Sequence, residues 1–167
     1  MRAFIVGCGR VGAGLAEHLA QSGHEVTIID TNSEAFNRLG ADFPGRAIRG
    51  DGTDDDQLGR AGLEGADAFF ALTEGDNRNI LAAQLAAETF KVPKVVAKIN
   101  DPVRAEAYAA LGIATLCRTR LLVDALAVYL GLPADLGARG VSPATGPHHG
   151  VEPERQGRAT VASGAEA

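Results

Sequence analysis

The sequence has few cysteines, no tryptophan and no excess of basic residues. Its two cysteines, Cys8 and Cys117, in 167 residues imply no disulfide framework, so we expect a cytosolic protein. Lys and Arg number 16 against 21 Asp and Glu, which gives a net charge of −5. A nucleic-acid binder needs a basic face, so nucleic acid is not an expected partner.

Long apolar runs are also missing. None approaches the ~18 residues of a membrane span, and the N-terminus lacks the charged, apolar and cleavage segments of a signal peptide. No direct membrane insertion is therefore expected. With 167 residues, 46% of them hydrophobic, the chain suits one soluble domain with a sizeable core.

The chain is organised around a glycine-rich turn near its N-terminus. Residues 3–6 read as a buried strand, and Gly7-Cys8-Gly9-Arg10-Val11-Gly12 leads from them into a helix. In such a turn Gly7 allows the bend, Gly9 lets a diphosphate approach the backbone, and Gly12 lets the helix pack on the sheet. The helix N-terminus would offer N–H groups and its positive dipole end to phosphates.

An acidic residue follows the next strand. The apolar run Val26–Ile29 closes on Asp30, where a carboxylate can accept hydrogen bonds from a ribose diol. A carboxylate would repel a 2′-phosphate, and Thr31 and Asn32 supply no arginine to hold one. The pattern therefore favours NAD or an adenosine phosphate over NADP.

The rest of the chain alternates strands and helices. Further strands are expected at 46–49, 66–72, 94–99 and 114–117, and helices at 33–39 (capped by Ser33), 54–61, 77–90, 102–111 and 118–131. This alternation predicts an α/β fold: a Rossmann-like, doubly wound, six-stranded parallel sheet with a C-terminal crossover helix. Ligands of such sheets bind at the carboxyl ends of the strands.

Polar residues collect at those carboxyl ends. Asp30, Asp51, Thr73 and Lys98 each end one of the predicted strands. Each one alone would be explained as a turn or capping residue. Together, around one glycine loop, they favour a common ligand.

The last predicted helix, 118–131, is apolar on most sides and must be buried on most sides, so it needs a partner. The chain from 132 to 167 is rich in Gly, Pro, Ser, Ala and charge, and we expect it to be disordered. His148 and His149 in this tail are too weak a pattern for a metal site.

Several motifs carry a family resemblance. They are Gly7–Gly12, Asp30, Gly50-Asp51-Gly52-Thr53-Asp54, Ala71-Leu72-Thr73 with Asn77-Arg78-Asn79-Ile80, and Ala97-Lys98-Ile99-Asn100-Asp101-Pro102. In order and spacing, residues 1–131 resemble the N-terminal nucleotide-binding domain of RCK/KTN proteins, the cytosolic regulators of Trk- and Ktr-type potassium transport. The Gly-Asp-Gly-Thr element separates this family from ordinary dehydrogenases.

The resemblance implies a nucleotide site for NAD(H) or ATP/ADP. Its expected binding residues are Gly7, Cys8, Gly9, Arg10, Val11, Gly12, Asp30, Thr31, Asp51, Gly52, Thr53, Thr73, Glu74 and Lys98. The glycine loop would hold phosphates, with Arg10 reaching a terminal phosphate or a neighbouring subunit. Asp30 would bind the ribose, Asp51 would border the adenine, and Lys98 would neutralise phosphate charge.

The implied function is regulatory. The chain would be a non-catalytic gating subunit at the cytoplasmic face of the membrane, attached through a potassium transporter or channel subunit. It would form a homodimer or larger ring through helix 118–131. Two departures matter: Arg118-Thr119 stands where many members have Pro followed by Glu or Thr, and 133–167 does not resemble the family's usual second domain.

Two other functions stay open at this point. An NAD-dependent oxidoreductase would need a substrate domain and an acid–base pair at the nicotinamide. His18 and His24 are poorly placed for that role. A nucleotide-sensing module for a soluble partner is also compatible with the sequence.

Overall fold

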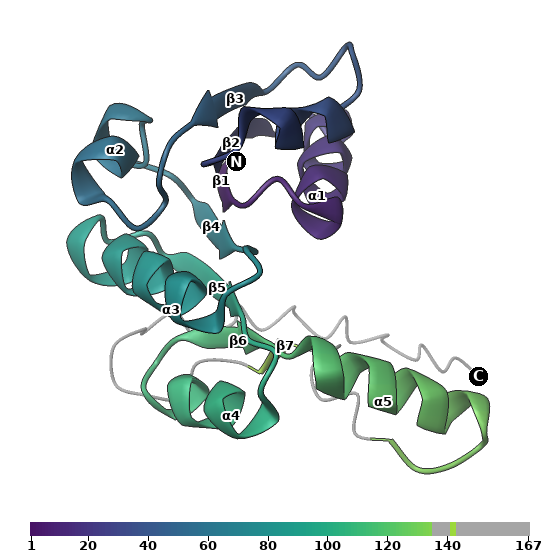
Figure 1. Cartoon of the computed structure of the whole chain (residues 1–167). Coiled ribbons are helices and arrows are strands. Elements are labelled where there is room, and N and C mark those ends of the chain that lie inside the picture. The colour runs from purple at the N-terminus through teal and green to yellow at the C-terminus, as the bar shows by residue number, and fades with distance from the viewer. Residues whose placement is uncertain (135–140, 143–167) are drawn as a thin grey trace, which may run out of the picture.

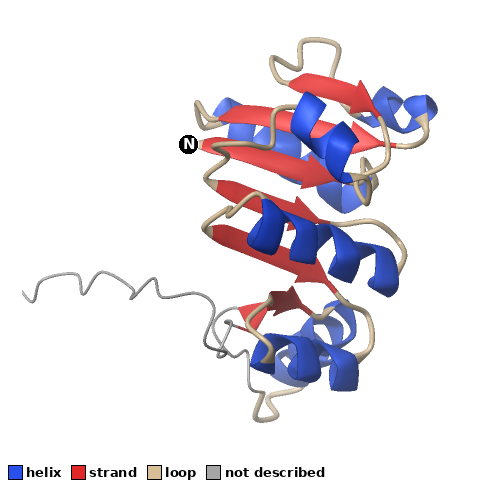
Figure 2. Cartoon of the chain, turned by 90° about the vertical axis from the view of Figure 1, so that its left-hand side faces the viewer, coloured by secondary structure: helices blue, strands red, loops and turns tan. Residues whose placement is uncertain are grey.

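Seven strands form one sheet in the computed structural model, which describes residues 1–134 and 141–142. The strands are β1 (Arg2–Val6), β2 (Glu25–Asp30), β3 (Arg46–Arg49), β4 (Ala68–Ala71), β5 (Lys94–Lys98), β6 (Ala114–Leu116) and β7 (Val141–Ser142). Their order is β3-β2-β1-β4-β5-β6-β7. All neighbours among the first six pair in parallel, and β7 pairs antiparallel with β6 (Figure 2).

Helices cover both faces of the sheet. They are α1 (Arg10–Gln21), the 3-10 helix η1 (Ser33–Arg38), α2 (Asp55–Arg60), α3 (Asp76–Gln84), the π-helical turn η2 (Leu85–Thr89), α4 (Pro102–Ala110) and α5 (Arg118–Tyr129). α1 and η1 pack on one face, and α2, α3 and α4 pack on the other (Figure 1). The doubly wound α/β fold is therefore confirmed.

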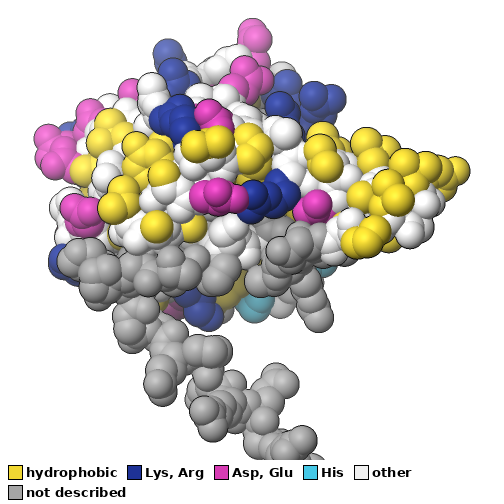
Figure 3. All heavy atoms as spheres, turned by 90° about the horizontal axis from the view of Figure 1, so that it is seen from below, with side chains coloured by type: hydrophobic (Ala, Val, Ile, Leu, Met, Phe, Trp, Pro, Cys, Tyr) yellow, Lys and Arg dark blue, Asp and Glu magenta, His cyan; other side chains and the backbone are white. Residues whose placement is uncertain are grey.

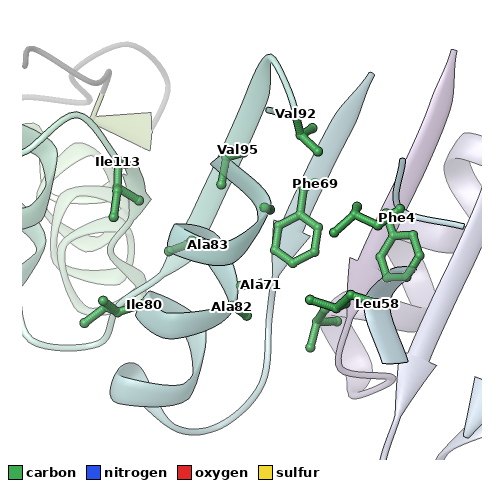
Figure 4. Packing of buried hydrophobic residues seen from close by; sticks show 14 of the residues in the cluster. Phe4, Leu58, Phe69, Ala71, Ile80, Ala82, Ala83, Val92, Val95 and Ile113 are labelled. Atoms are coloured by element: carbon green, nitrogen blue, oxygen red, sulfur yellow. The ribbon is translucent and has the colours of Figure 1, made fainter. Parts of the chain in front are cut away.

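Two apolar clusters, one on each face, hold the layers together. On one face Phe4 and Phe69 stack with ring centroids 6.0 Å apart. They pack against Leu58 of α2 and the small side chains Ala82 and Ala83 of α3 (Figure 4). Fully burying a Phe or Leu side chain stabilises a fold by about 1.5–3 kcal/mol. The small alanines let α3 lie close to the sheet, which fixes the loop that precedes it.

The seventh strand was not predicted from the sequence. Val141 and Ser142 pair with Leu116 and Thr115 at the edge of the sheet, so the prediction of six strands is wrong. β6 offers an unpaired edge of backbone N–H and C=O groups, and a two-residue strand that satisfies it needs no side-chain pattern. Most of the tail predicted to be disordered, with His148 and His149, lies outside the described residues.

Two predicted helices have a different local form. The segment predicted at 33–39 is a 3-10 helix, and Asn32, not Ser33, caps it: the Asn32 side chain accepts from the Glu34 N–H at 3.0 Å. The helix predicted at 77–90 divides into α3 and η2, where the Phe90 N–H donates to the Leu85 carbonyl. A π-type turn of this kind adds one residue to the helix, and no sequence pattern announces it.

The last helix, α5, projects away from the sheet (Figure 1). Within the described part of the chain, none of its residues is buried. Leu122, Val123, Leu126 and Tyr129 are all more than half exposed, and apolar side chains cover this projecting end of the molecule (Figure 3). Among residues 1–134 and 141–142, no helix has the length and apolar character to cross a bilayer.

Candidate functional site

A cavity of about 310 Å³ opens at the carboxyl ends of β1, β2 and β4. It is lined by Val6, Gly7, Cys8, Gly9, Ile29, Asp30, Thr31, Asn32, Ala35, Arg38, Gly50, Asp51, Gly52, Leu72, Thr73, Glu74 and Arg78. The chain leaves β1 toward α1 on one face and leaves the neighbouring β4 toward α3 on the other. Ligands of doubly wound sheets bind at this kind of switch point.

The glycine loop between β1 and α1 forms one wall. Gly7 has a φ of +102°, and a Cβ there would lie 2.9 Å from the Thr73 nitrogen. A Cβ on Gly12 would lie 1.9 Å from the Gly7 carbonyl oxygen. A Cβ on Gly9 would meet no heavy atom of the described residues within 4 Å. Gly7 and Gly12 are thus needed for packing, while Gly9 leaves open space for a ligand.

Asp30 is held by the backbone on both of its oxygens. Oδ2 accepts from the Cys8 N–H at 2.7 Å, and Oδ1 accepts from the Asn32 N–H at 2.9 Å. The carboxylate therefore has a fixed position beside the glycine loop. The Cys8 thiol below it donates to the Ala35 carbonyl at 3.4 Å. Burial, and then the Asp30 carboxylate, raise the pKa of Cys8, so this thiol is a packing group and not a reactive thiolate.

The loop after β3 supplies a second fixed carboxylate. Asp51 Oδ1 accepts from both the N–H and the hydroxyl of Thr53, at 2.9 and 2.7 Å. The Asp51 N–H donates to Gln57 Oε1 at 2.9 Å. Gln57 also donates to Asp54, the N-cap of α2, and these hydrogen bonds lower the pKa of Asp54. Gly52 is required here, because its Cβ would come within 2.2 Å of Val6 Cγ1.

The wall at β4 is fixed by a buried amide. Asn79 Oδ1 accepts from the N–H and hydroxyl of Thr73, at 2.8 and 2.7 Å. Its Nδ2 donates to the carbonyls of Thr73 and Lys98, at 3.0 and 2.8 Å. Asn79 is fully buried, so this one side chain joins the ends of β4 and β5 and holds Thr73 at the cavity.

Two arginines line the cavity that sequence reasoning did not assign to the site. Arg38 comes from η1 and Arg78 from α3, on opposite faces of the sheet. Arg38 makes a long hydrogen bond to the Ala35 carbonyl, at 3.4 Å. Neither guanidinium forms an ion pair with any residue in the described ranges. The sequence analysis found no arginine in Thr31 or Asn32 directly after Asp30, whereas Arg38 reaches the cavity from η1, eight residues after Asp30.

The cavity gathers most of the expected residues. Gly7, Cys8, Gly9, Asp30, Thr31, Asp51, Gly52, Thr73 and Glu74 line it, whereas Arg10, Val11, Gly12, Thr53 and Lys98 do not. Gly12 packs against the Gly7 carbonyl, and Thr53 donates to Asp51, so both position residues that do line the cavity. Arg10 and Val11 are the first two residues of α1, directly after Gly9. Lys98 is buried, and its pKa is lowered by burial and then by the Arg118 charge.

The polar groups that line the cavity suit the binding of a nucleotide better than the catalysis of a reaction. A volume of about 310 Å³ lies at the small end of the ~300–1,000 Å³ of ligand pockets. It can take an adenosine, with further phosphates extending beyond it. Asp30 and Asp51 can accept from ribose and base, and Arg38 and Arg78 can face phosphate. Among the described residues, no histidine lines the cavity.

A family comparison agrees with this geometry. The sequence profile of the TrkA-N domain matches residues 3–119. The chain belongs to the TrkA-N family. It is 50% identical over 124 residues to the Trk system potassium uptake protein TrkA of Streptomyces coelicolor, which covers 74% of this chain and 56% of the relative. A TrkA homologue of Methanothermobacter thermautotrophicus is 35% identical over 113 residues, 68% of this chain and 52% of the relative.

This TrkA-N chain thus spans about half the length of these two curated relatives. Both relatives are named for a Trk potassium uptake system. The resemblance to RCK/KTN regulators of the Trk type is confirmed.

Solved structures share the fold. The TrkA-N domain of the inner membrane protein ybaL from Escherichia coli superposes with a TM-score of 0.69 at 20% identity, over 77% of this chain and 96% of that one. The Kef C-terminal domain of Shewanella denitrificans, in its AMP-bound form, gives 0.64 at 22% identity, over 83% and 87%. The GsuK channel bound to NAD gives 0.62 at 20% identity, over 78% and 23%.

Proposed function

We propose that this chain is the nucleotide-binding regulatory module of a Trk-type potassium uptake system. It acts without catalysis, at the cytoplasmic face of the membrane, through a transporter or channel subunit. The names of its relatives support the potassium system. The observation that best supports nucleotide binding is the cavity: Asp30 and Asp51, both fixed by hydrogen bonds, line it together with the glycine loop.

The proposed ligand is an adenosine nucleotide, NAD(H) or ATP/ADP. AMP and NAD are the ligands named for two structures of the same fold. In this chain Asp30 would accept from the ribose hydroxyls and Asp51 from the adenine amino group. The phosphates would lie over Gly9, where the backbone is open, with Arg78 as a counter-charge.

Nucleotide can regulate only if it binds two states of the protein with different affinity. We propose that the two states differ in the arrangement of two copies joined through α5. The exposed apolar face of Leu122, Val123, Leu126 and Tyr129 would be covered by the same face of a second copy. A larger ring would add further contacts beneath the membrane subunit.

Thermal denaturation with nucleotide tests the ligand. NADH, NAD, ATP or ADP at millimolar concentration should raise the melting temperature of the chain. Asp30→Ala should weaken binding by about 10–100-fold, the usual effect of losing hydrogen bonds to a charged group. Asp67→Ala is the matched control, because Asp67 also accepts a backbone N–H, from Arg2, but at the other end of the sheet.

If none of the four nucleotides changes the melting of the wild-type chain, the proposed ligand is wrong. The proposed partner has its own test. A potassium transporter subunit should co-purify with the tagged chain from its native membranes. Recovery of soluble partners alone would instead favour a sensing module for a soluble protein.

A further inference from the structure

The loop between β4 and α3 belongs to the nucleotide cavity and also contacts the next strand connection. Thr73 and Glu74 line the cavity, and Asp76, two residues further on, is the first residue of α3. Its Oδ1 accepts from the backbone N–H and the side-chain amide of Asn100, at 3.0 and 2.8 Å, and its Oδ2 accepts from the Asp101 N–H at 3.3 Å. One carboxylate therefore joins the cavity loop to the turn between β5 and α4.

The same turn holds the start of α5. The hydroxyl of Thr119, in the first turn of α5, donates to the Asn100 carbonyl at 2.7 Å, and the thiol of the N-cap residue Cys117 donates to it at 3.7 Å. The rest of α5 projects away from the sheet (Figure 1), and within the described part of the chain none of its residues is buried. The contacts of the first turn therefore decide much of the direction in which the helix points.

Asn100 itself is not fully satisfied. Its Oδ1 is buried without a hydrogen-bond partner, and it is the one buried side-chain atom of this kind among the residues that the structure describes. Rotating the amide by half a turn would not relieve it, because Oδ1 would then face the Asp76 carboxylate in place of Nδ2. A buried acceptor without a partner is unfavourable. The turn therefore gains stability if it moves to a position where this oxygen meets a donor.

We propose that Asp76 and Asn100 couple the nucleotide cavity to α5. This inference deepens the proposed function and rests on it, because nucleotide is the ligand that displaces the cavity loop. A nucleotide that fills the cavity shifts the loop of Thr73 and Glu74 and with it Asp76. The two hydrogen bonds from Asn100 transmit the shift, and the Asn100 carbonyl passes it to Thr119. The free and bound states then differ in the direction of α5, which gives the two states that regulation requires.

The direction of α5 is measurable by double electron–electron resonance between two spin labels. Val128→Cys places one label at an exposed position on α5, and Glu64→Cys places the other at an exposed position before β4. The native Cys8 and Cys117 are buried and should stay unlabelled, and dilution with unlabelled chain leaves only distances within one molecule. A tilt of about 10° over the ~15 Å from the start of α5 to Val128 moves the label by about 2–3 Å. Saturating NADH or ADP should produce a shift of this size.

Thr119→Val should abolish the shift and leave the affinity for NADH and ADP within about twofold. Valine keeps the shape of threonine and loses the hydroxyl that donates to Asn100, and Thr119 does not line the cavity. Arg120→Gln is the matched control. Arg120 also joins the first turn of α5 to the domain, but through an ion pair with Glu106 of α4, a helix that does not line the cavity. This variant should keep the nucleotide-dependent shift.

Hydrogen exchange without nucleotide tests the connection by itself. Asp76→Ala should speed exchange of the backbone amides at 121–124, in α5, by about 2–10-fold, the equivalent of one lost hydrogen bond. Thr119→Val should do the same at 73–79, in the cavity loop. Thr119 is exposed, so this second variant should fold even if Asp76→Ala does not. Arg120→Gln should leave exchange at 73–79 unchanged.

The two measurements separate this inference from the proposed function. If wild type binds neither nucleotide, the proposed function fails, and hydrogen exchange alone decides whether Asp76 and Asn100 connect the loop to α5. If nucleotide binds and the label distance stays constant, coupling to α5 is refuted. Coupling through Asn100 is also refuted if Thr119→Val keeps the shift, if Arg120→Gln abolishes it equally, or if exchange at 73–79 in Thr119→Val stays at the wild-type rate.

Discussion

The two halves of the sheet's carboxyl edge differ in how far their polar groups are satisfied by the chain itself. Around β1, β2 and β3, Asp30 accepts hydrogen bonds from Cys8 of the glycine loop and from Asn32, and Asp51 accepts two from Thr53. Around β5 and β6, Lys98 and Arg118 have no ion pair with the described residues, and α5 has no buried residue.

The difference shows what each half requires. The half at β1 to β3 is preorganised: its carboxylates stand in position before any ligand arrives, so binding costs little ordering. The half at β5 and α5 instead carries an exposed apolar surface on α5, whose residues are all at least partly open to solvent in the single chain. Under the proposed function, a nucleotide held by the first half would regulate by changing what the second half contacts.

The largest expected effect comes from breaking the preorganised half at Gly12. Gly12→Ala would place a Cβ 1.9 Å from the Gly7 carbonyl oxygen, which is backbone and cannot move aside. Overpacking of this kind typically costs about 1–3 kcal/mol of folding free energy, occasionally more. We expect a loss at the upper end of this range or beyond it, with nucleotide binding lost as well, measured by urea denaturation and calorimetry.

Gly14→Ala is its control within the same helix. A Cβ there meets no described heavy atom within 4 Å, and alanine in a helix interior is favoured over glycine by about 0.5–1 kcal/mol. The two substitutions should therefore shift stability in opposite directions. Equal shifts would mean that the glycine loop is not packed against α1 as described.

The preorganised half is also the half that the sequence predicts best. The glycine spacing, Asp30 after an apolar run and Gly50–Thr53 are local patterns whose geometry follows from the strand and helix that flank them. Gln57 also had a local signal. Its position three residues after Asp54 is that of a capping box, and it holds the Asp51 loop.

A second prediction concerns α5. If two copies cover each other's α5 face, Leu126→Glu should convert the dimer to a monomer, because a charge would be buried against apolar side chains. Leu126 is 64% exposed in the single chain, so the substitution should not unfold the monomer. The melting temperature of Leu126→Glu should equal that of the wild-type chain diluted until it is monomeric. Light scattering after gel filtration gives the mass.

Leu111→Glu is the control for this comparison, since Leu111 at the end of α4 is equally exposed, at 65%. It should leave the mass unchanged. A wild-type chain that is monomeric at all concentrations, or a Leu126→Glu variant that remains dimeric, would contradict dimerisation through α5.

What sequence could not predict depends on tertiary placement. Arg38 and Arg78 reach the cavity because η1 and α3 pass on either side of it, and no spacing along the chain shows that they meet. Lys98 was expected in the cavity from its place at the end of β5. It lies beside it, because β4 separates β5 from β1 in the strand order. Strand ends in one sheet share an edge, but not always one pocket.

The smallest expected effect concerns Arg38, the cation beside Asp30 that the sequence did not predict, and its influence on NADPH binding relative to NADH binding. Arg38 and the Cys8 thiol donate to the same Ala35 carbonyl, so the guanidinium lies near Asp30, which Cys8 also contacts. Asp30 should make NADH bind more tightly than NADPH, because it repels a 2′-phosphate. Arg38 offsets part of that repulsion from an exposed position, where a charge contact is worth about 0.2–1 kcal/mol.

Arg38→Gln should therefore weaken NADPH binding by about 1.4–5-fold, the equivalent of that energy, and leave NADH binding nearly unchanged. Fluorescence titration of both reduced dinucleotides measures the ratio directly. Arg46→Gln is the control, because Arg46 lies at the first residue of β3, at the opposite end of the sheet from the ribose site. An equal loss for NADH and NADPH would show that Arg38 contacts a group common to both, such as the adenine, and not the 2′-position that separates them.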